Sequence, residues 1–308
     1  MAQQQAMKQP RKSKKTTVKR VVRRVRLWWK KASWRQRIRT IVAAILALLL
    51  VVAVSIPVVR FVSWRVAVHS ARHRQQELTQ TYDFDPGNII SDEQFFNGTA
   101  MNAKEIQAFL DEQGKQCTGE RCLKSMTFDT HPREANEYCS RIDLDGKQTA
   151  ATIIAAASKA CSVSPKVLLT MLQKEQQLVS ATDPSDFQFK SAMGLSCPDD
   201  AQCDPKYAGF YNQVAGSAER YQYYVHHEEQ YGYQDGQLNY VRYHPNESCG
   251  GEQVWIENKA TALLYIYTPY QPNRAALDAG VGEGDQCSTY GNRNFSIIYS
   301  NWFGDPRV

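Results

Sequence analysis

Glu175 is predicted to share a helix face with apolar side chains. It lies in the segment SPKVLLTMLQKEQQLVS, residues 164–180, within a series of positions spaced four, three and four apart. The aliphatic members of that series are Leu168, Leu172 and Val179. Burial beside apolar groups disfavours a charged carboxylate and raises its pKa, as a general acid working near neutral pH requires. Two alternatives stay open: Glu175 pairs with a neighbouring base, or this edge of the helix faces water.

The elements that must position Glu175 are mostly helices. Ser164 and Pro165 are a typical cap and first-turn pair, and they predict a helix over 165–180. Strand-like alternation occurs around 237–243. Further helical patterns cover 102–113, 149–161, 207–227, 253–267 and 295–302. The sequence therefore predicts a mainly α fold with long loops between its helices.

Four stretches of the chain occur in an order that resembles a known enzyme family. They are LLTMLQKEQQL, SAMGLSC, GFYNQVAGSAERY and ATALLYIYTPY. Their order over roughly 150–270 is similar to that of the motifs in goose-type lysozymes and lytic transglycosylases. The resemblance implies a lysozyme-like helical ectodomain, cleavage of peptidoglycan glycan strands and no cofactor.

The resemblance also implies roles for particular residues. Glu175 matches the catalytic general acid of the family, near the end of a helix. Met193, Gly194 and Leu195 match the segment that lines the sugar groove. Tyr265 matches the tyrosine that supports the acid.

Several positions depart from the family pattern. Gln176 stands where the family usually has Ser, and Ile266 stands where it has Asn. Ser196 and Cys197 stand where it has Met or Trp and then Gln. The full pattern, including FFNGTAMNAKEIQAFL, also resembles actinobacterial surface proteins labelled hemagglutinin. These departures favour an alternative in which the protein is a glycan-binding adhesin or cell-wall scaffold without acid catalysis.

Aromatic residues are a second indication of a glycan ligand. The chain has 16 tyrosines, many of them between 221 and 270, and Tyr267 is the one that we expect to contact substrate. Aromatic faces with a polar tip suit sugar rings, which stack on one face and hydrogen-bond at their edges. For any single tyrosine, a place at the edge of the core is the alternative.

No second carboxylate is fixed as a partner for Glu175. The aspartates that follow it within thirty residues include Asp186, Asp199, Asp200 and Asp204. The last three of these belong to or flank the loop between Cys197 and Cys203. A site with one carboxylate fits a lytic transglycosylase, in which a hydroxyl of the substrate closes on the anomeric carbon. Hydrolysis by a positioned water is the other possibility.

The charge of the chain is divided between a basic arm and an acidic body. Residues 1–40 contain 15 basic and no acidic side chains, and 41–59 are 19 uncharged positions, long enough to span most of a bilayer. Because Arg60 and Arg65 follow directly, an uncleaved signal anchor is favoured over a cleaved secretory signal. The positive-inside rule predicts a single-pass cell-membrane protein with a cytoplasmic N-terminus and an extracellular C-terminal domain. The arm is expected to meet membrane lipid rather than nucleic acid, or else to assemble with division proteins.

The eight cysteines all follow the apolar span. An even number of cysteines, all on the same side of the span, predicts disulfides in an oxidising compartment. Sequential pairing is expected, with Cys117 joined to Cys122, Cys139 to Cys161, Cys197 to Cys203 and Cys249 to Cys287. No cysteine pair has zinc-knuckle spacing, so we expect no metal.

These observations predict five segments. Residues 1–40 form the basic cytoplasmic arm, 41–59 the transmembrane anchor and 60–81 a helical stalk. Residues 82–147 form an N-terminal subdomain of the ectodomain, and 148–308 form the lysozyme-like domain. The expected partners are peptidoglycan or another surface glycan, and membrane lipid through the span and the arm.

Overall fold

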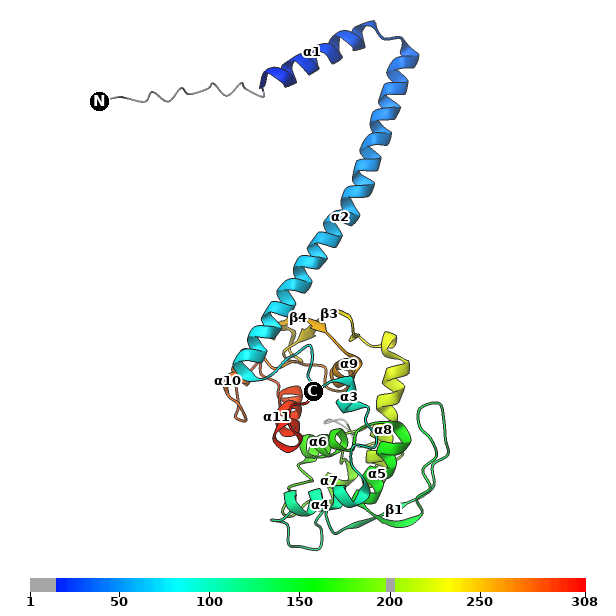
Figure 1. Cartoon of the computed structure of the whole chain (residues 1–308), viewed down its shortest axis with the longest axis vertical. Helices are drawn as coiled ribbons and strands as arrows, with labels where there is room; N and C mark the ends of the chain where they lie inside the picture. Colours follow the sequence, from blue (N-terminus) through cyan, green and yellow to red (C-terminus); the bar gives the residue numbers. More distant parts are fainter. Residues whose placement is uncertain (1–14, 198–202) are drawn as a thin grey trace, which may run out of the picture. The chain divides into compact units, whose positions relative to one another are not determined.

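The computed structural model describes residues 15–197 and 203–308 (Figure 1). The chain divides into two compact units, Met1–Val66 and Ala67–Val308, and each is described by itself. The first fourteen residues of the basic arm lie outside the described residues, as do Asp199 and Asp200.

The first unit contains α1 (Lys15–Lys31) and most of α2 (Trp34–Tyr82). Helix α2 continues without interruption through Pro57 and through the predicted stalk. Its apolar window has a mean hydropathy of 3.0 and no buried residues, so α2 is long and apolar enough to cross a membrane. The predicted apolar span and the helical continuation after it are therefore both present.

The second unit is mainly α-helical, as predicted. Helix α5 packs against α4 and α8, and α6 packs against α11 (Figure 1). The helices after α2 are α3 (Asp92–Phe95), α4 (Ala103–Gln113), α5 (Ala150–Cys161), α6 (Pro165–Gln176), α7 (Asp186–Lys190), α8 (Phe210–His226), α9 (Lys259–Tyr267), α10 (Arg274–Asp278) and α11 (Gly291–Phe303). Two short 3₁₀ helices cover Glu228–Gln230 and Glu247–Cys249.

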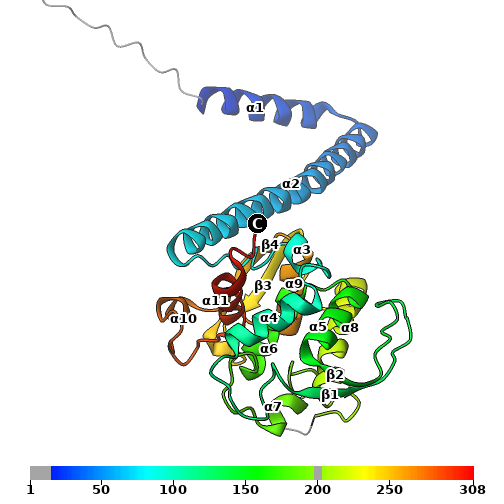
Figure 2. The same cartoon turned by 60° about the horizontal axis from the view of Figure 1, so that its bottom comes forward.

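Two small antiparallel sheets complete this unit. One pairs β1 (Thr127–Thr130) with β2 (Gly146–Thr149), and the other pairs β3 (Gln237–Arg242) with β4 (Gly251–Ile256). The two hairpins lie at opposite ends of the unit (Figure 1 and Figure 2). In the second sheet, Tyr240 lies opposite Gln253.

One hydrophobic core extends through the whole of the second unit. It includes Phe95, Ile106 and Leu110 before residue 147, and Leu168 and Tyr221 after it, all at most 1% exposed. The rings of Phe95 and Tyr221 meet edge to face, with centroids 5.1 Å apart. The segments on either side of residue 147 therefore share one buried interior.

The local patterns that predicted the early helices are present as side-chain caps. Asn102 accepts a hydrogen bond from the backbone of Glu105 at 3.1 Å, and Glu105 accepts one from the backbone of Asn102 at 2.8 Å. This reciprocal capping box satisfies donors that a helix start leaves free. Thr149 caps α5 through the backbone of Thr152.

The structure corrects two predicted boundaries. The helix predicted over 253–267 begins at Lys259, because residues 251–256 pair with β3 as a strand. The helix predicted over 165–180 ends at Gln176, because Gln177 adopts a left-handed conformation with φ 55°. Val179 therefore lies beyond the helix that carries Glu175, although it is buried.

All eight cysteines form disulfides, with the sequential pairing expected from the sequence. The pairs are Cys117–Cys122, Cys139–Cys161, Cys197–Cys203 and Cys249–Cys287. The second bond joins the loop before β2 to the end of α5. The fourth joins the β3–β4 hairpin to the segment before α11.

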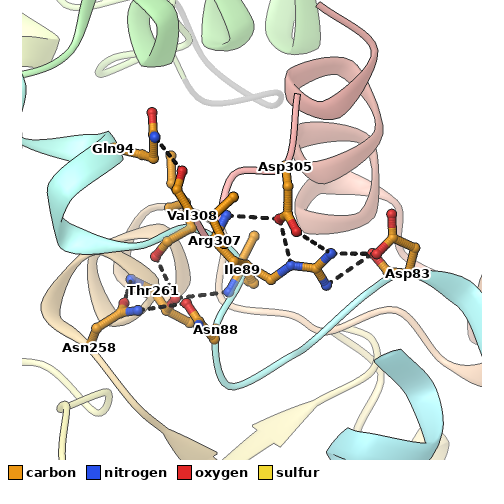
Figure 3. Close-up of polar contacts among 10 residues, drawn as sticks. Asp83, Asn88, Ile89, Gln94, Asn258, Thr261, Asp305, Arg307 and Val308 are labelled. Atoms are coloured by element: carbon orange, nitrogen blue, oxygen red, sulfur yellow. Dashed lines mark hydrogen bonds and ion pairs between the residues drawn. The ribbon is translucent and has the colours of Figure 1, made fainter. Parts of the chain in front are cut away.

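The end of the chain is tied to the start of the second unit (Figure 3). Arg307 forms ion pairs with Asp83 and with Asp305, the latter at 2.7 Å. The backbone of Ser91 donates to the carbonyl of Pro306 at 3.0 Å. Hydrogen bonding from Arg307 holds the pKa of the Asp305 carboxyl below its usual range.

Candidate functional site

Glu175 lies in the last turn of α6. Most of this helix is core, since the side chains from Val167 to Leu172 are fully buried. The Glu175 side chain is 24% exposed, so the carboxylate emerges where the buried helix ends. It forms an ion pair with Lys174, whose side chain is only 7% exposed. The alternative that Glu175 pairs with a neighbouring base is thus what the structure shows.

Lys174 is held in place by residues of α9 and the turn after it. Its Nζ atom lies 3.3 Å from Oγ1 of Thr268 and 5.9 Å from the centroid of the Tyr267 ring. A helix C-terminus carries partial negative charge, which disfavours a carboxylate there. The Lys174 ammonium offsets this effect and is itself stabilised by the aromatic face.

Gly194 approaches Glu175 through its backbone. Its φ of +73° is a left-handed conformation that favours glycine. A Cβ atom at this position would lie 3.4 Å from Oε2 of Glu175. The structure therefore brings Gly194 and the predicted acid together, as the resemblance implied.

The side chains next to Gly194 are largely buried. Met193 is fully buried and Leu195 is 6% exposed. Their role in lining a sugar groove stays a prediction, and these side chains offer little exposed surface for it. Contact of this segment with a glycan would come from Gly194 and from backbone groups.

Gln213 of α8 fixes the backbone of this segment. Its Oε1 atom accepts hydrogen bonds from the backbone of Met193 and of Leu195, each at 3.0 Å. Its Nε2 atom donates to the carbonyls of Leu195 and Tyr207, each at 2.8 Å. The side chain is fully buried. Gln213 is a positioning residue that was not predicted from the sequence. The one sequence feature that indicates its role is an amide side chain on the apolar face of a predicted helix.

Of Tyr265 and Tyr267, Tyr267 is the one that interacts with the charge of Glu175. Tyr265 is fully buried and donates its hydroxyl to the carbonyl of Pro86 at 2.9 Å, so this hydroxyl is already engaged and its role in supporting the acid stays a prediction. Tyr267 donates to the carbonyl of Met193. Burial raises the pKa of the Tyr267 hydroxyl well above its usual range, and the charge of Glu175 raises it further. Tyr267 is therefore a neutral hydrogen-bond donor at physiological pH.

A hollow of about 190 Å³ lies along α8, and its lining does not include Glu175, Tyr267 or the segment 193–195. A Cβ atom at Gly216, which lies in its wall, would be 2.9 Å from the Leu195 side chain. The charged and aromatic residues of the wall include Arg133, Lys206, Tyr207, Glu219, Arg220 and Tyr223. Glu219 is bound to Arg133 at 2.6 Å, while the guanidinium of Arg220 lies 5.2 Å from the Tyr223 ring centroid. Such a wall can stack on a sugar and attract an acidic group.

Two of the aspartates that follow Glu175, Asp186 and Asp204, have other partners. Asp186 binds Arg121 at 2.8 Å and has a side chain that is 97% exposed. Asp204 accepts a hydrogen bond from the backbone of Lys206 at 2.9 Å. Within 15–197 and 203–308, no group of three or more His, Cys, Asp or Glu residues could hold a metal ion.

Comparison with known proteins gives one result. A protein family described as LasA, N-terminal domain, matches residues 88–308. The match begins after α2 and extends to the end of the chain. Neither the curated proteins nor the solved structures contain a match.

Proposed function

The chain belongs to the family described as LasA, N-terminal domain, and for this chain we propose cleavage of peptidoglycan glycan strands with Glu175 as general acid. In this proposal the Ala67–Val308 unit is a lysozyme-like domain that acts on the cell wall near the membrane. The observation that carries the proposal is the meeting of three segments at one carboxylate. Glu175 from the end of α6, Gly194 and Tyr267 belong to segments whose order matches the enzyme motifs.

The proposed reaction follows from this arrangement. Protonated Glu175 donates its proton to the glycosidic oxygen between two amino sugars, and that bond breaks as an oxocarbenium-like centre develops. A hydroxyl of the substrate then attacks the anomeric carbon and returns its proton to Glu175, which leaves an anhydro product. If water attacks instead, the product carries a reducing end. The neutral hydroxyl of Tyr267 fixes the carbonyl of Met193 beside the reacting group.

We further propose that α2 holds this unit at the outer face of the cell membrane. Its apolar window is long enough to span a bilayer, and all 15 basic residues of 1–40 precede it. Basic flanks remain on the cytoplasmic side, so Ala67–Val308 would lie outside. Four disulfides in that unit agree with an oxidising compartment.

A second candidate is a glycan-binding module that does not cleave. The ion pair with Lys174 favours it, because in that pair the Glu175 carboxylate accepts from a buried ammonium group, whereas a general acid donates a proton. The cationic and aromatic hollow along α8 also suits binding of an acidic sugar.

Digestion of purified peptidoglycan sacculi distinguishes the two candidates. The full chain, purified in detergent with its disulfides formed, is compared with Glu175→Gln and with the exposed control Glu229→Gln. Anhydro products identify a transglycosylase and reducing-end products a hydrolase, and either must disappear in Glu175→Gln alone. No release by any of the three proteins, with all three sedimenting on the sacculi, refutes cleavage and supports the binding module.

A further inference from the structure

Helix α1 separates an apolar face from a basic one. On a wheel of 100° per residue, five large apolar side chains fall within an arc of about 120°. They are Val21, Val22, Val25, Trp28 and Trp29, with exposed fractions from 37% to 55%. Leu27 is the apolar exception on the opposite side. A stable soluble helix does not leave such a stripe in water, so the stripe requires a partner.

The remainder of α1 is strongly cationic. The basic residues beside and opposite the stripe are Lys19, Arg20, Arg23, Arg24, Arg26, Lys30 and Lys31. Residues 1–40 contain no Asp or Glu at all, so no carboxylate of the arm can neutralise this charge. The partner of α1 must therefore offer both an apolar surface and negative charge.

We propose that α1 lies in the plane of the membrane surface and inserts its apolar face among the anionic lipids of the leaflet that α2 enters. This proposal rests on α2 crossing the membrane, as proposed above, and is independent of the glycan activity. Amphipathic helices of this composition bury their apolar face at the boundary between headgroups and acyl chains. Each basic side chain near an anionic leaflet adds to the attraction.

The connection between the two helices places α1 at the required depth. The backbone of Ser33 donates to Oε1 of Gln36 at 2.9 Å, and this contact fixes the start of α2. The stretch from Trp34 to Ile41 covers about 10 Å of helix before the uncharged span begins. One headgroup layer is about 5–8 Å thick, so this stretch is long enough to cross it. The guanidinium of Arg37 lies 6.0 Å from the Trp29 ring centroid, which is a typical pairing for that layer.

Other partners satisfy only half of the requirement. A nucleic acid would neutralise the basic face but would leave the valines and tryptophans in water. A second copy of α1 would cover the apolar face but would bring two sets of seven cations together. The lipid surface meets both needs and is already adjacent to α2.

Hydrogen exchange of the full chain in lipid nanodiscs tests the proposal. Amides of α1 are expected to exchange at least about tenfold more slowly in discs that contain phosphatidylglycerol than in phosphatidylcholine discs, because several cations contribute to the attraction. Val25→Asp should abolish this difference. Leu27→Asp introduces the same charge on the opposite face and should largely retain it.

Each other outcome overturns the proposal. Equal exchange of α1 in both lipids refutes lipid insertion, as do equal effects of the two aspartate variants. If the amides of α1 are protected only when nucleic acid is added, the partner of α1 is a nucleic acid. If they are protected only when one disc holds two chains, the partner is a second copy of α1. The amides of residues 41–59 serve as the internal reference. Rapid exchange of these amides in every disc would refute the membrane span. If they are protected while α1 is not, only the inference about α1 is refuted.

Discussion

The backbone of Gly194 lies directly against the carboxylate of Glu175. A Cβ atom at residue 194 would stand 3.4 Å from Oε2 of Glu175, and the φ of +73° suits only glycine without strain. The backbone conformation therefore selects glycine at this position, whereas a methyl group would make an ordinary van der Waals contact with the carboxylate.

Gly194→Ala is expected to impair both stability and function. The left-handed conformation costs a residue with a side chain about 1–2 kcal/mol, and the new methyl group would lie in contact with the carboxylate of Glu175. Gly146→Ala is the matched control, because Gly146 has φ +71° and no atom lies within 4 Å of the place that a methyl group would take there. Denaturant unfolding and sacculus digestion of both variants check this. Equal activity of the two folded variants would contradict a role of Gly194 at the site.

Tyr267→Phe and Tyr265→Phe should have different effects. Removing the Tyr267 hydroxyl frees the carbonyl of Met193 beside Glu175, so glycan release should fall. Removing the Tyr265 hydroxyl leaves the carbonyl of Pro86 without its buried donor and should cost about 1–3 kcal/mol of stability, with activity of the folded protein unchanged. Loss of activity in Tyr265→Phe but not in Tyr267→Phe would restore the assignment made from the resemblance.

Gln213→Leu should be much more destabilising than a similar change elsewhere on α8. Gln213 satisfies four backbone groups, whereas Gln222 donates once, to the carbonyl of Cys161. Unsatisfied buried groups cost about 1–3 kcal/mol each, so Gln213→Leu should lose at least about 2 kcal/mol more than Gln222→Leu. The free energy of unfolding from denaturant titration gives this difference. Equal losses would show that the hydrogen bonds of Gln213 do not hold the segment.

Asp305→Asn should lower stability at neutral pH but not in acid. Because Arg307 depresses the folded-state pKa of Asp305, its contribution is present above the unfolded value of about 3.9 and disappears as pH falls through the folded value. The unfolding midpoints of wild type and variant should therefore begin to approach each other below about pH 4 and should meet only below the depressed folded-state pKa. Asp183→Asn, an exposed control, should match wild type throughout. A difference for Asp305→Asn that persists at low pH would contradict the ion pair as its cause.

Local signals in the sequence predicted most helices correctly. Asn102 and Thr149 are caps that act within a few residues, so the starts of α4 and α5 can be predicted without knowledge of the fold. Strand β4 was predicted as helix because its hydrogen-bond partners lie in β3, outside the local pattern. The end of α6 was placed too late because Gln177 adopts a left-handed conformation that its residue type does not signal.

The candidate site was predictable only in part. Glu175 and Gly194 were identified by motif order, and the structure brings them together. Residues two positions apart on a helix point in directions that differ by about 200°. Motif matching alone therefore could not decide which of Tyr265 and Tyr267 faces Glu175. The role of Gln213 depends on hydrogen bonds to a segment distant in sequence, and no local pattern reports such contacts.

The rate of glycan release by Glu175→Gln tests the central claim most directly. The substitution keeps the shape of the side chain and removes its ability to transfer a proton. At equal folded fraction and with intact disulfides, release of soluble fragments from sacculi should fall at least about 100-fold below wild type, the usual contribution of general acid catalysis. Release by Glu175→Gln at the wild-type rate would contradict the assignment of Glu175 as the acid.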